Sequence, residues 1–263
     1  MNGPFIVDAH AHTGAMGLFF TPESGATALL ARMDRLDIRC CLNAGSWAYL
    51  MQGGREELEA LRREHEASRG RLLYLGVFDP RRGKEALREL ETACRRPGLA
   101  GIKIHPTFHR TPAESPGYEA LWRFAEEHDL TVLTHSWSSS EHNPAQALSL
   151  PGRFAAWVRR YGDVRLVLAH AGGRGDGRAE AVRLAREHPN VYLDLAGDIF
   201  CYRLLETLSA ELPPNKLLFG SDFPWLDPRA NLSRILLADI PAEAKRRILR
   251  DNAQEAYQLN LSG

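Results

Sequence analysis

Residues 101–137 read GIKIHPTFHRTPAESPGYEALWRFAEEHDLTVLTHSW. Two short runs rich in apolar and β-branched residues, Gly101–Pro106 and Thr131–Trp137, enclose a stretch with helical periodicity, Pro116–His128. A strand, a helix and a second strand in this order form a unit with two parallel strands, because the helix carries the chain back along the sheet. The stretch therefore predicts an α/β fold with a parallel sheet.

The same alternation recurs through the whole chain. We predict eight strands, at Phe5–His12, Arg39–Gly45, Leu72–Asp79, Gly101–Pro106, Thr131–Trp137, Arg165–Gly172, Val191–Gly197 and Leu217–Pro224. Amphipathic helices are clearest at Gly54–Ser68, Lys84–Arg95, Pro116–His128, Pro151–Tyr161 and Arg178–His188, and one or two extra closing helices are expected between Pro241 and Leu259. Eight such units in 263 residues fit a (β/α)8 TIM barrel better than an open doubly wound sheet. No linker interrupts them, so residues 1–263 are expected to form a single domain.

Charge and composition narrow the class of protein. The chain has 33 basic and 33 acidic side chains, and this balance argues against a nucleic-acid or membrane-surface partner. The first residues resemble no signal peptide, and no window reaches the ~18 apolar residues of a membrane span. The cysteines, Cys40, Cys41, Cys94 and Cys201, form no CxxC pair. We expect a cytoplasmic enzyme with a small-molecule substrate, and homo-oligomerisation remains open.

Polar side chains gather where the predicted strands end. His10 and His12 lie two residues apart, so on a strand they point to the same face with Cα atoms about 6–7 Å apart. His135, His170 and Asp222 end the fifth, sixth and eighth predicted strands, so all five face one mouth of the barrel. Imidazole nitrogens and carboxylate oxygens bind zinc, and a catalytic ion uses three or four protein ligands beside an open position. The set predicts one divalent metal ion, with Zn²⁺ favoured over Mn²⁺ or another divalent ion.

Four further residues are candidates for binding substrate. Lys103 and His105 lie two apart in GIKIHP, so both are expected to face the mouth while Ile102 and Ile104 pack outward. Trp137 is a candidate wall of an apolar pocket, and Arg174 a candidate partner for a carboxylate. Long connections at Thr13–Gly25, Thr107–Ser115 and Ser138–Ser149 would lie on the same face, where binding loops usually form.

These motifs resemble the amidohydrolase superfamily of metal-dependent barrels, and within it the branch containing the aminocarboxymuconate semialdehyde decarboxylase-like enzymes. The similarity runs through DAHAH, GIKIHP, LTHSW, LAHAGG and FGSDFPW to the closing DNAQEAYQL. It implies that His10, His12, His135 and Asp222 bind the metal and that His170 orients or activates the metal-bound water.

The resemblance leaves the role of Lys103 open. In binuclear members of the superfamily a lysine on the fourth strand is carboxylated and bridges two metals, whereas the branch most similar to this chain is usually mononuclear. We favour one metal, with Lys103 as a cation that meets a carboxylate or carbonyl of the substrate.

Three functions follow as hypotheses. The first is a metal-dependent hydrolase that cleaves a C–N or C–O bond, as in an amide, lactone or ester, of a small carboxylated molecule, with Asp222 also carrying a proton to the leaving group. The second is a lyase on the same site, a non-oxidative decarboxylase or hydratase. Decarboxylases of that branch carry a longer insert after the fifth-strand histidine than the Ser-rich sequel here, which favours hydrolysis. The third is a barrel that binds metal without turnover.

Overall fold

Eight short parallel strands form the centre of the molecule in the computed structural model, which describes residues 5–261. They are β1 (Ile6–Ala11), β2 (Ile38–Asn43), β3 (Leu72–Val77), β4 (Leu99–Ile104), β5 (Thr131–Thr134), β6 (Leu166–Leu168), β7 (Val191–Asp194) and β8 (Leu217–Leu218). Each strand pairs with the next in chain order. Backbone hydrogen bonds from Ala9 N to Phe219 O (2.9 Å) and from Asp222 N to His10 O (2.9 Å) join the segment around β8 to β1. The sheet is therefore a nearly closed barrel.

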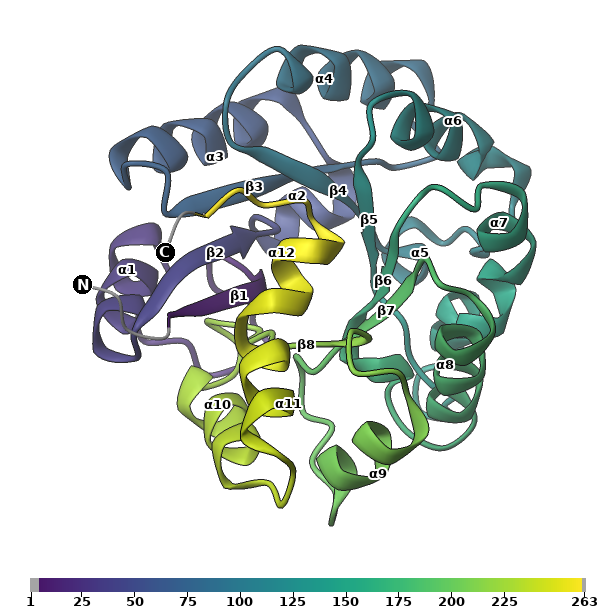
Figure 1. The fold of residues 1–263 in the computed structure, drawn as a ribbon. Helices are drawn as coiled ribbons and strands as arrows, with labels where there is room; N and C mark the ends of the chain where they lie inside the picture. The colour runs from purple at the N-terminus through teal and green to yellow at the C-terminus, as the bar shows by residue number, and fades with distance from the viewer. Residues whose placement is uncertain (1–4, 262–263) are drawn as a thin grey trace.

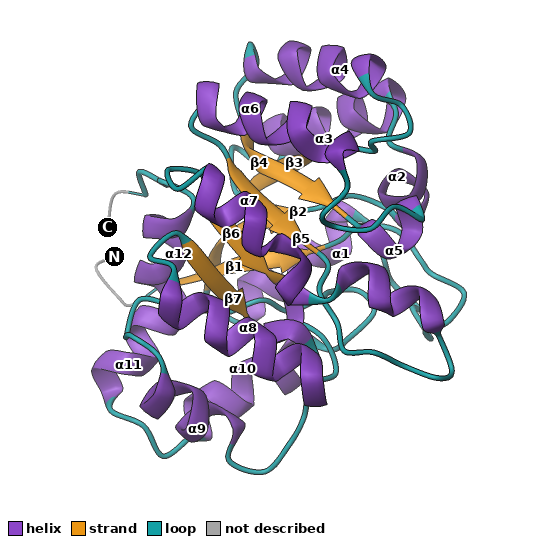
Figure 2. Cartoon of the chain, turned by 90° about the vertical axis from the view of Figure 1, so that its right-hand side faces the viewer, coloured by secondary structure: helices purple, strands orange, loops and turns teal. Residues whose placement is uncertain are grey.

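Helices surround this ring of strands (Figures 1 and 2). They are α1 (Ala26–Arg35), α2 (Trp47–Gln52), α3 (Arg55–Ala67), α4 (Lys84–Cys94), α5 (Pro106–His109), α6 (Glu119–Glu127), α7 (Ala155–Arg160), α8 (Gly175–Glu187), α9 (Leu204–Glu211), α10 (Pro228–Leu237), α11 (Ala242–Arg246) and α12 (Asn252–Ala256). Short 3₁₀ turns precede α6 and α7, and a π-helical turn, Arg247–Asp251, joins α11 to α12. The predicted (β/α)8 TIM barrel with extra C-terminal helices is confirmed.

The strands are buried on both faces, as parallel strands in a barrel must be. Ile102 and Ile104 of β4 belong to one apolar cluster together with Leu90 of α4 and Leu121 of α6, which confirms their outward packing. Alternate residues from other strands form a second cluster, which includes Leu75, Leu133, Val167 and Leu218. Because successive side chains of a strand point to opposite faces, Lys103 points into the barrel.

The two ends of the barrel carry different elements. At the N-terminal ends of the strands, α12 lies in front of the ring in Figure 1, and Thr131 at the beginning of β5 donates a hydrogen bond to the carbonyl of Ala256 (2.5 Å). The C-terminal ends carry the long connections. Two of these are more ordered than expected, because α5 begins at Pro106 and a 3₁₀ turn occupies Pro144–Ser149. No helix within residues 5–261 is both long and apolar enough to cross a membrane.

Most predicted strands are longer than the observed ones, because the polar residues at their C-terminal ends do not pair with the neighbouring strands. β6 ends at Leu168 rather than Gly172, and β8 ends at Leu218 rather than Pro224. His170 and Asp222, which follow these strands, have left-handed backbone angles, with φ of 58° and 60°. Non-glycine residues rarely adopt this region, and where they do it is often at a functional site. The turns that end the strands thus place the polar side chains at the mouth.

Candidate metal centre

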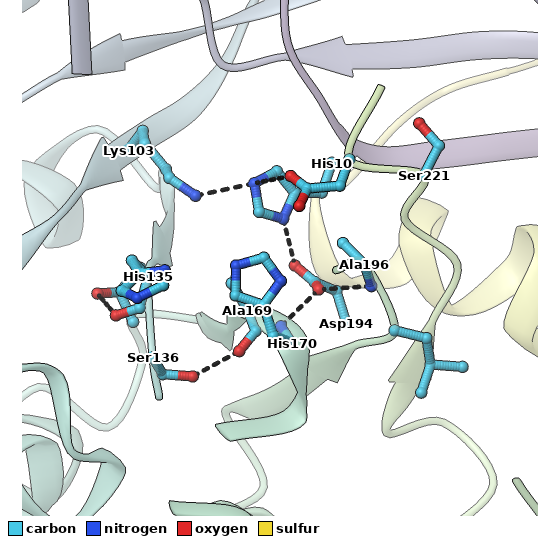
Figure 3. A network of polar contacts seen from close by, with 12 residues as sticks. His10, Lys103, His135, Ser136, Ala169, His170, Asp194, Ala196 and Ser221 are labelled. Atoms are coloured by element: carbon cyan, nitrogen blue, oxygen red, sulfur yellow. Dashed lines mark hydrogen bonds and ion pairs between the residues drawn. The ribbon is translucent and has the colours of Figure 1, made fainter. Parts of the chain in front are cut away.

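His10 and His12 turn their rings toward each other at the end of β1. Their Nε2 atoms are 3.1 Å apart. His12 Nδ1 lies 3.1 Å from the carbonyl oxygen of Gly45, and His10 Nδ1 lies 2.9 Å from Asp194 Oδ2 (Figure 3). Because a carbonyl and a carboxylate oxygen only accept hydrogen bonds, each Nδ1 carries the ring proton of a neutral imidazole. Two unprotonated Nε2 atoms therefore face the same point.

Asp222 brings a carboxylate to that point. Its Oδ1 lies 3.5 Å from His12 Nε2 and 3.9 Å from His10 Nε2. This buried oxygen has no hydrogen-bond partner in the part of the chain that the structure describes. Ligand atoms of the three residues all lie within 4.8 Å of one another. Two nitrogen lone pairs and an unpartnered carboxylate oxygen form a donor set that fits a divalent cation.

The charge states of the three residues suit that cation. Burial is the main cause that lowers the pKa of His10 well below its usual range, and burial also lowers the pKa of His12. Both rings are therefore neutral at pH 7, which is the form that binds metals. Burial alone would raise the pKa of Asp222, but the neighbouring histidines hold it below its usual range, so its side chain is a carboxylate.

His135 is the predicted ligand that the structure leaves outside this cluster. It follows β5, and its Nε2 lies 2.9 Å from Gln146 Oε1. Its ring stacks on that of His105, with centroids 4.1 Å apart, and lies 5.2 Å from that of His170. His135 thus forms the wall beside the cluster, and its role as a metal ligand stays a prediction.

His170 lies next to the cluster without an assigned partner. Its ring centroid is 5.3 Å from that of His10, and its buried Nδ1 has no hydrogen bond within residues 5–261. Gly197, at φ +83°, makes room for the ring, because a Cβ there would lie 2.5 Å from His170 Nδ1. A ring nitrogen in this position is available to hold or accept a proton.

Lys103 and His105 both reach the cavity, as their spacing predicts. Lys103 is 1% exposed, and its Nζ donates a hydrogen bond to His10 Nε2 (2.9 Å). Burial lowers its pKa to about 8. His105 stacks between His135 and Phe108, and its Nδ1 accepts a hydrogen bond from the backbone N–H of Phe108 (3.3 Å). These contacts place an amine beside the cluster and an aromatic column along the wall.

Sequence analysis missed Asp194, which joins three parts of the site. Its side chain is fully buried at the end of β7, contacts the His10 ring, and accepts hydrogen bonds from the backbone N–H groups of His170 (2.8 Å) and Ala196 (3.0 Å). The available signal was an acidic residue in the middle of a predicted apolar strand, VYLDLAG, and the structure shows this residue to be the last of β7. Asp8 shares this burial, but within residues 5–261 it accepts hydrogen bonds only from the backbone N–H groups of His10 and Ser221.

A cavity of about 210 Å³ opens over the cluster. The cluster residues, Lys103, His105, His135 and His170 line it together with aromatic side chains, Phe19, Trp47, Phe108, Trp137 and Trp225. Arg174 lies outside this lining, paired with Asp198 (3.2 Å) and with its guanidinium 5.7 Å from the Trp137 ring centroid. A larger hollow of about 830 Å³ between α8 and α9 contains none of the predicted site residues. The smaller cavity is thus the one that joins the cluster to solvent.

Comparisons with known proteins agree with this architecture. A family model described as Amidohydrolase matches residues 7–259. No curated protein matches the chain.

Solved structures with the same fold include three decarboxylases of low sequence identity. The 2,6-dihydroxybenzoate decarboxylase from Rhizobium is 13% identical, with a TM-score of 0.80 over 97% of this chain and 99% of that one. A manganese-bound dihydroxybenzoic acid decarboxylase from a Polaromonas species is 14% identical, with a TM-score of 0.79 over 99% and 98%. The 5-carboxyvanillate decarboxylase from Sphingomonas paucimobilis is 14% identical, with a TM-score of 0.73 over 98% and 100%. At these identities the likeness shows the fold.

Proposed function

The chain belongs to the amidohydrolase family, and from this premise we propose that it is a divalent-metal-dependent enzyme that hydrolyses a C–N or C–O bond of a small carboxylated molecule. The amide, lactone and ester classes all fit this chemistry. One observation carries the proposal: His10, His12 and Asp222 converge on one point at the floor of a cavity that also contains a buried lysine.

The nitrogen and carboxylate donors support the assignment of a metal site. His10, His12 and Asp222 would hold the ion, and His135 on the adjoining wall is the candidate fourth ligand. Such a cation supplies Lewis acidity, which makes water a nucleophile at neutral pH. Zn²⁺ is our first assignment from the nitrogen and carboxylate ligands, and the manganese in the Polaromonas structure makes Mn²⁺ the alternative. A second metal bridged by a carboxylated Lys103 remains the less favoured arrangement, because the branch that the sequence motifs resemble is usually mononuclear.

The position of each remaining side chain suggests its role in the reaction. Asp222 takes the proton of the attacking water and delivers it to the leaving group, since its Oδ1 has no hydrogen-bond partner among residues 5–261. His170 holds that water through its Nδ1, which also has no hydrogen-bond partner in the described chain. Lys103 binds the substrate carboxylate, and His105 and Trp137 form the wall against which the substrate packs. Arg174, on the rim, is assigned the more distant role of attracting an anionic substrate.

Non-oxidative decarboxylation is the second candidate, and the aromatic walls favour it. Trp47 and Phe108 pack edge to face with centroids 4.1 Å apart, and Trp225 lies 6.0 Å from Trp47. Flat walls of this kind suit an aromatic acid, and the structurally similar proteins include decarboxylases of such acids. In this reaction the bond to the carboxyl carbon breaks, CO₂ leaves, and Asp222 would take a proton from water and deliver it to the ring carbon. A hydratase would use the same groups to add water to a double bond.

Isotope labelling separates these reactions on one protein preparation. Wild-type protein loaded with Zn²⁺ or Mn²⁺ is incubated with a panel of carboxylated amides, lactones, esters and aromatic acids in H₂¹⁸O and, separately, in D₂O. Hydrolysis places one ¹⁸O in the product, whereas decarboxylation releases CO₂ and places one deuterium on carbon. Binding without conversion across the panel would support the non-catalytic barrel and overturn the proposal.

A further inference from the structure

We propose that Asp194 is the positioning residue of this centre: it keeps the proton of His10 on Nδ1 and anchors the turn that presents His170. The inference rests on the proposed function, since it explains how this chain prepares the residues assigned to the metal. It concerns a side chain outside the group of His10, His12 and Asp222, although its carboxylate lies within 4.8 Å of ligand atoms of His10 and His170.

The first support is the contact with His10. Asp194 Oδ2 lies 2.9 Å from His10 Nδ1, and both side chains are at most 1% exposed, so water does not compete for this bond. A carboxylate cannot donate, and the proton therefore resides on Nδ1. The opposite ring nitrogen agrees, because His10 Nε2 accepts from Lys103 Nζ at 2.9 Å. This tautomer keeps a lone pair on Nε2, which accepts from Lys103 here and which a cation would take over in its place, as carboxylate partners of metal-binding histidines generally arrange.

The second support is the contact with the turn after β6. Asp194 Oδ1 accepts from the backbone N–H groups of His170 (2.8 Å) and Ala196 (3.0 Å), as Figure 3 shows. His170 and Ala171 both have left-handed backbone angles, which cost energy in residues with a Cβ. The Asp194 carboxylate offsets part of that cost at the residue whose ring faces the cluster. One side chain thus ties β7 to the ligand on β1 and to the turn after β6.

An amide of the same shape cannot make all three contacts, because the carboxylate accepts hydrogen bonds at both oxygens and an amide accepts at only one. All partners of the carboxylate are donors. In Asp194→Asn the amide oxygen satisfies the two backbone N–H groups, which leaves the NH₂ group facing His10 Nδ1. That nitrogen must then accept, the ring proton moves to Nε2, and the lone pair needed by the cation disappears. The reverse orientation would set NH₂ against two N–H donors.

Asp8 provides a matched control for the same substitution. It is equally buried on β1, the strand of His10, but among the described residues its carboxylate accepts only from the backbone N–H groups of His10 (3.2 Å) and Ser221 (2.9 Å), both at Oδ1. Its Oδ2 has no hydrogen-bond partner in the described residues. An amide at this position can keep Oδ1 as the acceptor, so Asp8→Asn changes a buried aspartate without touching an imidazole.

The experiment measures the tautomer and the metal affinity in the full chain. Long-range ¹H–¹⁵N correlation spectra of metal-free wild type, Asp194→Asn and Asp8→Asn report which nitrogen of His10 is protonated, with His10→Gln identifying the resonances. Competition with a chromophoric chelator gives the affinity for Zn²⁺ and Mn²⁺. We expect Nδ1–H in wild type and Asp8→Asn, Nε2–H in Asp194→Asn, and an affinity about 10–100-fold weaker in Asp194→Asn alone.

The outcomes separate this inference from the proposed function. An unchanged tautomer in Asp194→Asn, or an affinity within threefold of wild type, overturns the inference while the metal enzyme stands. Wild type that binds neither metal overturns the proposed function, but the tautomer shift still supports the positioning role. If Asp194→Asn does not fold, wild type alone is decisive, because a His10 ring protonated on Nε2 contradicts the inference.

Discussion

Two buried lysines lie at opposite ends of the barrel and have different surroundings. Lys216, before β8, is 3% exposed, and its Nζ donates to the carbonyls of His188 (3.0 Å), Pro189 (2.7 Å) and Val191 (2.9 Å). Lys103, near the C-terminal end of β4, is 1% exposed, and among the described residues it has one hydrogen bond, to His10 Nε2. Burial lowers the pKa of both to about 8.

The difference separates a structural end of the barrel from a reactive one. Lys216 satisfies carbonyls just beyond the C-terminus of α8, where a cation is stabilising. Lys103 keeps donor capacity directed at a cavity, and the same end of the barrel contains the unpartnered atoms Asp222 Oδ1 and His170 Nδ1. Substitutions at the C-terminal end should therefore change chemistry, and substitutions at the N-terminal end should change stability.

Asp222→Ala should have the largest effect. It removes the only carboxylate of the proposed ligand cluster and the group assigned to proton transfer, so we expect kcat/KM to fall at least ~10³-fold and metal affinity to drop. The metal-free protein should still fold but lose some stability at pH 7, because the lowered pKa of Asp222 shows that its carboxylate is stabilised in the folded chain. Steady-state kinetics and calorimetry measure the two quantities. Full turnover in this variant would break the division between the two ends.

Lys103→Met should come next. It removes the cation assigned to the substrate carboxylate, so we expect a loss of about 10²-fold in kcat/KM, which corresponds to about 2.7 kcal/mol. Stability should be unchanged or slightly higher, since a buried ammonium with one partner is replaced by an apolar side chain. The exposed Lys84→Met is the control for the substitution itself. A large fall in thermal midpoint with unaltered kinetics would assign Lys103 a structural role instead.

Lys216→Met is the same substitution at the other end, and we expect the reverse result. Three carbonyl groups lose their shared donor, which should cost about 2–3 kcal/mol and lower Tm by about 4–10 °C. The activity per folded molecule and the metal content should match wild type. Denaturation curves together with active-site titration test this prediction. A stable but inactive variant would contradict it.

Glu64→Gln gives the smallest effect and tests a carboxyl that is partly buried outside the cavity, against the last residue of β2. Glu64 on α3 accepts a hydrogen bond from Asn43 Nδ2 (3.0 Å), and burial, aided by the charge of Glu57, raises its pKa to about 7. Between pH 4.5 and 7 the unfolded chain loses this proton while the folded chain keeps it, so wild-type stability falls across that window.

Glutamine does not titrate, so the free energy of unfolding of the variant should equal that of wild type near pH 4.5 and exceed it by about 1 kcal/mol at pH 8. Urea denaturation at both pH values is the measurement, with the exposed Glu126→Gln on α6 as the control. A difference that does not depend on pH would show that the carboxyl is already ionised in the folded protein.

Strand order and the location of the site were predictable from sequence because they depend on local pattern. Short apolar runs alternating with amphipathic stretches predicted all eight strands, and the spacing of His10 and His12 predicted that their rings share a face. The predicted strand ends were less accurate. The left-handed turns at His170 and Asp222 depend on tertiary contacts that periodicity does not report.

The connections within the site escaped prediction for a related reason. Asp194 contacts His10 across 184 positions of sequence, and Gln146 contacts His135 from a loop expected to be irregular. Neither pairing follows from the residue types alone, because hydrogen bonds of this kind depend on where the strand ends meet. The roles of the individual site residues, including His135 as a ligand, remain predictions for the experiments above.

The stacking of Trp225 on His12 gives the centre an optical reporter. The two rings are nearly parallel, with centroids 3.9 Å apart and an interplanar angle of 20°. Indole emission is quenched more strongly by an imidazole that bears positive charge, so occupation of His12 Nε2 by a cation should dim this fluorophore. Trp122 and Trp157 lie in the helical layer and supply a constant background, whereas Trp47 and Trp137 line the same cavity and would contribute to the change. Titrating the metal-free protein while recording its ultraviolet emission would then follow loading in real time, without any attached dye.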